Sequence, residues 1–330
     1  MPSMVNGKRR FLTACAAATL ACLLGPAGAQ TADHYPDRPI RMVVGFPAGG
    51  ATDVLARLVA QRLGTRLGQS VVVENQPGAS GMIATNGVAK ARKDGLTLLF
   101  ASSTHAVYPD LYAKVDFDPV ASFTPIGLVA ATPYVMVVHP SLPVKSVAEL
   151  IAYAKAHPGQ VDYAGSSPGT AQHLGWELFK RVAQVDMQYI PYKGSSDLLP
   201  DLKTGRIQAA IDNVAVMRSH IEDGSLRGIA VTSSEPSAVL PGVPPISATL
   251  PGFQTIGWFG VFGPAGLPKP IADRLSAELR AVMGEQDVRD RLLGLGAEAR
   301  DGSAEALRTL LASEVATWSQ VIKDAGIKAQ

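Results

Sequence analysis

Short apolar runs alternate with segments of helical periodicity through most of the 330-residue chain. The runs 40–45, 71–74 and 96–102 are typical of buried strands, whereas residues 54–60 and the segment ending near residue 89 have helical spacing. Strands that alternate with helices predict an α/β fold, in which a parallel sheet carries helices on both faces. In such sheets ligands bind beyond the carboxyl ends of the strands, so we expect the functional residues in the loops that follow them.

A second series of strands and helices begins near residue 130. Its expected elements, in chain order, are 134–138, 146–156, 161–164, 170–182, 187–191, 195–202, 208–211, a helix from about 213, and 228–232. The chain then returns to the first series through a strand at 253–262 and helices near 271–283, 287–293 and 304–325. We therefore expect two doubly wound α/β domains, residues 30–129 plus 252–330 and residues 130–251, joined by crossing strands around a central ligand cleft.

The N-terminus has the pattern of an export signal. Basic residues 8–10 precede the apolar run 11–24, and Ala27-Gly28-Ala29 matches a signal-peptidase site. The apolar run is shorter than the roughly 20 residues that a membrane-spanning helix needs. We expect residues 1–29 to be a signal peptide that is cleaved after Ala29. Residues 8–12 weakly resemble a twin-arginine signal, and the general secretory route is the expectation.

The predicted leader changes what the composition implies. Both cysteines, Cys15 and Cys22, lie within it, so we expect no disulfide and no cysteine-based metal site in the mature chain. The chain has 30 Lys and Arg against 28 Asp and Glu, and the leader holds three basic and no acidic residues, which leaves 27 against 28, a net charge of −1. This balance does not indicate a nucleic-acid partner. The six histidines lack metal-ligand spacing, so we expect no metal and no cofactor.

The first candidate binding site is the segment 46–53, Phe-Pro-Ala-Gly-Gly-Ala-Thr-Asp, which we call the first Gly-rich loop. It joins an expected strand to an expected helix, and Thr52 or Asp53 is a natural N-cap for that helix. A Gly-rich turn before a helix N-terminus directs several backbone N–H groups at one point, where the helix dipole also favours an anion. An ordinary strand–helix turn has the same residue types, and this segment alone does not separate the two interpretations.

The second candidate is Gly165-Ser166-Ser167-Pro168-Gly169, which with Thr170 forms the second Gly-rich loop. Its G-x-S-x-G pattern is that of the nucleophile elbow of α/β-hydrolases, in which Ser167 would be the nucleophile. The residue after that serine must donate a backbone N–H to the oxyanion, and Pro168 has none. We therefore favour a second anion-binding loop in which Thr170 caps the following helix, and a periplasmic serine hydrolase is the alternative.

Three further polar residues stand where expected strands end. Ser102 and Ser103 follow the strand 96–102, although hydroxyls at such places also serve as turn and cap groups. Asp212 ends a strand of the second series. It is equally consistent with a hydrogen bond to a ligand or bound water and with a cap on the next helix.

Several segments, in order along the chain, carry a family resemblance. They are Tyr35-Pro36-Asp37-Arg38-Pro39-Ile40-Arg41, Phe46 to Asp53, Val71-Val72-Val73-Glu74-Asn75, Pro140-Ser141-Leu142-Pro143, His173-Leu174-Gly175, Pro191-Tyr192-Lys193-Gly194, Val231-Thr232-Ser233 and Gly263-Pro264-Ala265-Gly266. With these segments the chain, from Tyr35 almost to its C-terminus, resembles the substrate-binding proteins of tripartite tricarboxylate transporters, also called Bug receptors. It departs from the family pattern at Ala48, where a second proline is common, and at Val44-Gly45.

The resemblance implies a type II periplasmic-binding-protein-like fold and a monomeric periplasmic receptor for a small mono- or dicarboxylate, amino acid or aromatic acid. It implies delivery of the ligand to the membrane components of a tripartite tricarboxylate-type transporter, without catalysis. A ligand sensor for a two-component signalling system would have the same ligand chemistry. The ligand-binding residues that it implies are Phe46, Ala48, Gly49, Thr52, Asp53, Ser102, Ser103, Ser166, Ser167, Thr170 and Asp212. Such receptors hold carboxylates with backbone N–H groups, hydroxyls and ordered water, in agreement with the lack of Lys and Arg in both Gly-rich loops.

Overall fold

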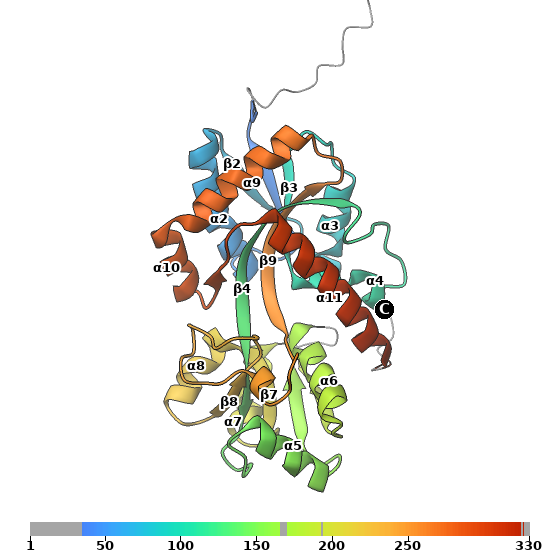
Figure 1. Ribbon diagram of the computed structural model, residues 1–330, viewed down its shortest axis with the longest axis vertical. Coiled ribbons are helices and arrows are strands. Elements are labelled where there is room, and N and C mark those ends of the chain that lie inside the picture. The colour runs from blue at the N-terminus through green and yellow to red at the C-terminus, as the bar shows by residue number, and fades with distance from the viewer. Residues whose placement is uncertain (1–34, 166–169, 193, 325, 327–330) are drawn as a thin grey trace, which may run out of the picture. The chain divides into compact units, whose positions relative to one another are not determined.

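The computed structural model describes residues 35–165, 170–192, 194–324 and 326 (Figure 1). Residues 36–330 form one compact unit, and every element below belongs to it. The predicted leader and its cleavage site after Ala29 lie outside the described residues, as do Ser166 and Ser167. No helix in the described ranges combines the length and the apolar character needed to cross a membrane.

The N-terminal alternation produces the parallel part of a first sheet. Its strands are β1 (Ile40–Val44), β2 (Val71–Asn75) and β3 (Thr97–Ser102), and β1 pairs in parallel with both of the others. The helices between them are α2 (Ala51–Leu67), the short 3-10 helix η2 (Ala79–Gly81) and α3 (Met82–Ala89). The three strands agree with the expected ones to within one residue, because each is marked by its own apolar run, and α3 ends at the expected residue 89. α2 begins three residues before and ends seven residues after the expected helical segment 54–60.

Three further strands complete this sheet, and each runs antiparallel to its neighbours; one of them is the two-residue β10 (Glu298–Ala299), which pairs with β4. β9 (Ile256–Pro264) pairs with β3 and with the first part of β4 (Phe123–Val138), which gives the order β2-β1-β3-β9-β4. The expectation of a parallel sheet is therefore wrong for this part of the fold, and the sheet is mixed. β4 has 16 residues, where the sequence predicted a strand only at 134–138. Pro125 and Gly127 are unusual inside strands, so the sequence does not indicate the part of β4 before residue 134. The pairing of β4 with β9 shifts register between these two residues.

The second part of β4 belongs to a second sheet. Its other strands are β5 (Asp162–Gly165), β6 (Gln188–Pro191), β7 (Ala209–Asn213) and β8 (Arg227–Val231). β5 pairs in parallel with β6 and β7, whereas β4 pairs antiparallel with β7 and β8. The helices of this region are α5 (Val147–Ala156), α6 (Ala171–Ala183), α7 (Ser195–Lys203) and α8 (Val214–Glu222).

The remaining elements follow β3, precede β9 or complete the C-terminus. They are η3 (Ser103–Ala106), α4 (Tyr108–Leu111), η4 (Ile246–Ala248), α9 (Lys269–Gly284), α10 (Gln286–Gly294), β10 (Glu298–Ala299) and α11 (Ala304–Asp324). α9 and α11 both pack on β4, and α9 also packs on α2. A Cβ at Gly260 of β9 would lie 2.7 Å from a Leu307 methyl group, so glycine is what allows α11 to pack this closely on the strand.

The chain passes from the first sheet to the second within β4 and returns between β8 and β9 (Figure 1). Thr232, which is fully buried, hydrogen-bonds to both passages. Its N–H donates to the Tyr134 carbonyl at 2.9 Å, and its own carbonyl accepts from the Thr255 N–H at 3.0 Å. Its Oγ1 also accepts from the Tyr134 N–H at 3.2 Å. One threonine therefore connects the outgoing and the returning segments.

Candidate functional site

The first Gly-rich loop is held by a carboxylate of its own chain. Asp53 is 3% exposed, and its Oδ2 accepts from the Gly49 N–H at 2.8 Å and from Arg57 Nε at 3.0 Å. Asn75 Nδ2, at the end of β2, donates to Asp53 Oδ1 at 2.9 Å and to the Phe46 carbonyl at 3.0 Å. The Arg57 guanidinium is the main cause that lowers the pKa of Asp53 to about 2, so this side chain is an anion at neutral pH.

This arrangement corrects two details of the sequence interpretation. α2 begins at Ala51 with Gly50 at its N-cap, so neither Thr52 nor Asp53 caps the helix. The carboxylate of Asp53 instead reaches back to the Gly49 amide, which therefore already has an anionic partner. The N–H groups of the first helical turn lack intrahelical acceptors, and Ala48, Gly50 and Ala51 are exposed. These backbone N–H groups are therefore accessible to an anion.

A strained segment that the sequence analysis did not single out packs against this loop. Four consecutive residues have positive φ: 144° at Gly78, 46° at Ala79, 53° at Ser80 and 96° at Gly81. Left-handed backbone at a residue other than glycine costs about 1–2 kcal/mol and must be held by its surroundings. A Cβ at Gly45 would lie only 2.5 Å from the Gly81 Cα, so the segment touches the end of β1. In the sequence, the only sign of this strained segment is the pair of glycines, Gly78 and Gly81, that flank Ala79 and Ser80.

A chain of hydroxyl groups links this segment to the loop after β3. Tyr108 Oη donates to the Ser80 carbonyl at 2.9 Å and lies 3.5 Å from Thr104 Oγ1. Thr104 Oγ1 lies 2.9 Å from Ser102 Oγ. A Cβ at Gly81 would lie 3.4 Å from the Phe46 ring and 2.9 Å from Tyr108 Oη. The structure thereby brings Phe46 and Ser102 to the same region, through residues far apart in the sequence.

The loop after β3 also meets the N-terminus of α6. A small hollow is lined by Ser103 and Thr104 on one side and by Ala171 and Leu174 on the other. The remaining lining residues are Val107, Ile256 and Trp318. Ala171 is the first residue of α6 and directly follows Thr170. Ser103 therefore lies near the N-terminus of α6.

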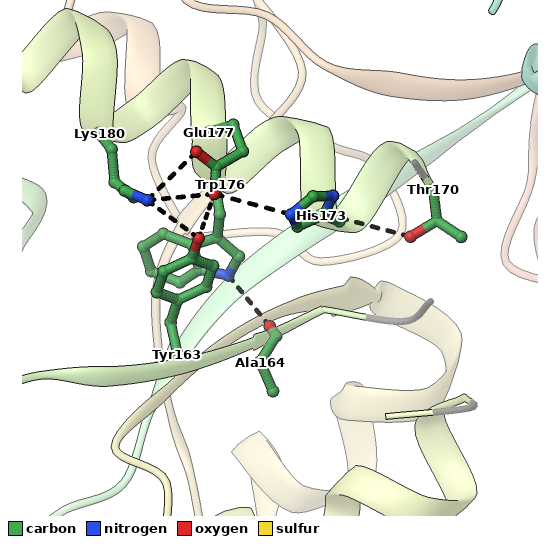
Figure 2. Close-up of polar contacts among 7 residues, drawn as sticks. All are labelled: Tyr163, Ala164, Thr170, His173, Trp176, Glu177 and Lys180. Atoms are coloured by element: carbon green, nitrogen blue, oxygen red, sulfur yellow. Dashed lines mark hydrogen bonds and ion pairs between the residues drawn. The ribbon is translucent and has the colours of Figure 1, made fainter. Parts of the chain in front are cut away.

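The N-terminus of α6 forms as the sequence predicts. Thr170 is its N-cap, and the Thr170 Oγ1 accepts from the His173 N–H at 3.5 Å (Figure 2). A Cβ at Gly165 would lie 2.8 Å from the His173 nitrogen, so only glycine lets the helix start this close to the end of β5. Ser166 and Ser167, the other predicted residues of this loop, are outside the described part of the chain.

A partly buried polar network fixes α6 on β5 (Figure 2). Tyr163 of β5 donates to Glu177 Oε1, and Lys180 Nζ lies 3.2 Å from both Glu177 oxygens. His173 Nε2 is 3.7 Å from the same Glu177 carboxylate, and burial lowers the His173 pKa. Trp176 Nε1 donates to the Ala164 carbonyl at 3.1 Å. Two helical turns are thereby anchored, and with them the direction of the helix N-terminus.

Asp212 lies at the end of β7 and is fully buried. Its Oδ1 accepts from Ser195 Oγ at 2.9 Å and from the Asn213 N–H at 2.6 Å, whereas its Oδ2 has no hydrogen bond of acceptable geometry to a described residue. Burial raises the Asp212 pKa, and the nearby Ser195, Asn213 and Gln172 side chains or amides oppose that rise. Asn213 caps α8 by accepting from the Ala215 N–H, so the capping interpretation of Asp212 is wrong. Ser195, at the start of α7, is a partner that the sequence analysis missed.

The described residues do not include a group of three or more His, Cys, Asp or Glu side chains that could hold a metal ion. The only histidine in the chain order required of a hydrolase, His220, lies in the last turn of α8, 3.8 Å from Asp223. The site offers helix N-termini, hydroxyls and two buried carboxylates, of which Asp53 is paired with an arginine and Asp212 is not. Helix N-termini and hydroxyls suit an anionic ligand.

Two α/β sheets joined by crossing strands, with helix N-termini and hydroxyl-bearing loops brought together, define the class of periplasmic binding proteins. Within this class, the chain belongs to the receptors of the tripartite tricarboxylate transporter family, whose model, "Tripartite tricarboxylate transporter family receptor", matches residues 55–327. This confirms the family and the fold class that the sequence resemblance implied.

Solved structures of three relatives agree with this assignment. An R. palustris protein, Rpa4515, with adipate is 38% identical, with a TM-score of 0.73 over 90% of this chain and 100% of that chain. The periplasmic binding protein BugD is 34% identical, with a TM-score of 0.70 over 90% and 100%. MatC from Rhodopseudomonas palustris with bound malate is 31% identical, with a TM-score of 0.70 over 87% and 100%.

Proposed function

We propose that this protein captures a small mono- or dicarboxylate in the periplasm and delivers it to the membrane components of a tripartite tricarboxylate-type transporter. One observation carries the proposal: the N-terminus of α6 faces the hydroxyl-bearing loop after β3, in a site whose Gly-rich loops contain no Lys or Arg. The relatives with adipate and malate support a carboxylate ligand, and these two acids are the first candidates. Amino acids and aromatic acids carry the same carboxylate group, so they are candidate ligands to be tested alongside adipate and malate.

The proposed binding groups act in different ways. Backbone N–H groups at the start of α2 and α6 bind the carboxylate oxygens, as helix N-termini do for other anions. Phe46 packs on the body of the ligand, while Ala48 and Gly49 shape the loop and Asp53 braces it. The hydroxyl donors are Thr52, Ser102, Ser103, Ser166 and Ser167. Thr170 keeps the first turn of α6 in place, and Asp212 accepts from the ligand or from bound water.

The domain division and the export route belong to the same proposal. Residues 30–129 with 252–330 form one domain and residues 130–251 the other, and they close on the ligand about the segments bonded to Thr232. The signal peptide is cleaved after Ala29, and the mature protein is a monomer in the periplasm without catalytic activity. The lack of an N–H at Pro168 and the position of His220 both count against a hydrolase.

Native mass spectrometry of the protein, purified from periplasm without refolding, tests the proposal. We expect a mature chain that begins at Gln30 and carries a small carboxylic acid, which excess adipate or malate displaces. A Thr170→Val variant should carry less ligand, because valine keeps the shape and removes the capping hydroxyl, whereas Thr170→Ser should retain it. A wild-type protein that carries no acid and whose melting temperature no carboxylate raises would contradict the proposal.

A further inference from the structure

Exposed apolar side chains gather beside α2 and α10. Val54 is 36% exposed, Leu293 44% and Leu295 46%. A surface groove runs between the two helices, and we call it the α2–α10 groove. It is lined by Val54, Leu58 and Leu295, with Arg57, Gln61 and Arg291 beside them. Apolar groups clustered at a groove and bordered by arginine have the composition of a protein–protein interface.

One end of the groove touches the region of the second sheet. Gly296 follows Leu295 with a φ of 74°, and a Cβ there would lie 2.4 Å from the Ala215 Cβ in the first turn of α8. The next residue of α8, Val216, is also exposed. Two residues beyond Gly296, Glu298 Oε1 accepts from Ser237 Oγ at 2.7 Å and from the Ala238 N–H at 3.2 Å. The segment after α10 is therefore fastened to residues that follow β8.

The other wall of the groove leads to the first Gly-rich loop. Arg57 lines the groove and pairs with Asp53, with 2.9 Å between Nη2 and Oδ1. Asp53 in turn accepts from the Gly49 N–H. A molecule bound in the groove would therefore contact Arg57, whose partner Asp53 holds the first Gly-rich loop. It would also contact the segment after α10, which packs against α8.

We infer that the α2–α10 groove is the docking surface for a membrane component of the transporter, through a periplasm-facing segment with an apolar side chain flanked by acidic residues. The inference rests on the proposed function. Charge selects this occupant: Arg57 is already paired with Asp53, so Arg291 supplies the uncompensated positive charge of the described lining, which holds no carboxylate. Arg291 forms no ion pair with any described residue, so its guanidinium is available to an acidic partner.

Uptake and ligand binding, measured side by side, test the inference. The variants are Leu295→Asp and Arg291→Glu, in the full-length chain expressed in its source strain without the native copy. The probe is radiolabelled adipate or malate, whichever acid binds the wild-type protein by calorimetry. We expect unchanged ligand affinity and uptake lowered at least about tenfold, the scale of a central interface contact. Arg291→Lys should restore uptake, and Val182→Asp, an equally exposed apolar site on α6, should leave it unchanged.

The outcomes separate the inference from the function on which it rests. If the wild-type receptor binds the acid but supports no uptake, the proposed function fails and the docking surface fails with it. If the wild-type receptor supports uptake and both groove variants do so equally well, only the docking surface is refuted. A photocrosslinker at position 295 that links to a membrane component of the transporter supports the inference, and one that links to a second copy of this chain overturns it.

Discussion

Asp53→Asn tests how the first Gly-rich loop is held. The substitution keeps the size of the side chain and one acceptor oxygen for the Gly49 N–H, but it removes the charge that pairs with Arg57. In the wild-type protein, Arg57 is the main cause that lowers the pKa of Asp53 from its ordinary value of 3.8 to about 2. The ionised Asp53 carboxylate is therefore more stable in the folded protein than in the unfolded chain.

The expected loss of stability follows from this pKa. One pKa unit corresponds to about 1.4 kcal/mol, so the charged Asp53 contributes about 2 kcal/mol to the free energy of unfolding at pH 7. The Arg57 side chain is 51% exposed, and solvent screening makes this an upper value. Because the folded pKa is the lowered one, the contribution is complete above the ordinary pKa and disappears as the pH falls through about 2.

Urea unfolding at pH 7 and pH 2.5, followed by tryptophan fluorescence, measures the difference between the wild type and Asp53→Asn. The matched control is Glu74→Gln. Glu74 pairs with Arg41 at 2.8 Å, but the two side chains are 42% and 51% exposed, so its loss should cost under about 1 kcal/mol. Equal losses in both variants, or an Asp53→Asn loss that is as large at pH 2.5 as at pH 7, would show that the Asp53–Arg57 pair does not supply this stability.

Two further predictions concern other parts of the structure. Gly165→Ala should weaken carboxylate binding about tenfold or more in calorimetry, because its Cβ would lie 2.8 Å from the His173 nitrogen and displace the start of α6. The control is Gly284→Ala, where an added Cβ meets nothing within 4 Å. Equal affinities in the two variants would speak against the prediction. Glu314 is buried beside Trp258, and burial raises its pKa from 4.5 to about 7. Because the folded pKa is the raised one, stability is lost as the pH rises from about 4.5 to about 7. Glu314→Gln should therefore gain up to about 3 kcal/mol over the wild type at pH 8.5 and little at pH 4 in urea unfolding, and a difference independent of pH would contradict this.

The sequence predicted those elements whose signals are local. Thr170 caps α6 as expected, because a cap and its partner amide are only three residues apart, and the helix expected at 146–156 is α5. The predicted N-cap of α2, Thr52 or Asp53, was two or three residues too late, because Gly50 holds that position. Asp53 has the residue type of an N-cap, but its carboxylate bonds to Gly49 and Arg57 within the same turn.

Contacts between distant segments could not be predicted in this way. The antiparallel pairing of β4 with β9 joins residues more than 120 positions apart, and Pro125 conceals the first part of β4. In the site, the Arg57 partner of Asp53 is visible at helical spacing, whereas the Asn75 partner comes from another strand. The bond between Tyr108 and the Ser80 carbonyl, and the bond between Ser195 and Asp212, also arise only on folding.

We propose that a carboxylate is held by helix N-termini and hydroxyls, without a cationic side chain. Titration calorimetry with adipate and malate, at low and at high salt, tests this in the wild type, Thr170→Val and Lys193→Met. Lys193, which lies outside the described residues, is the competing candidate for a cationic partner of the ligand. Partly buried hydrogen bonds are screened less than a surface ion pair, so we expect the affinity to depend weakly on salt. We also expect an affinity loss of about 1–3 kcal/mol for Thr170→Val and little loss for Lys193→Met. If Lys193→Met abolishes binding and Thr170→Val leaves it unchanged, a cationic side chain and not the helix N-termini holds the carboxylate.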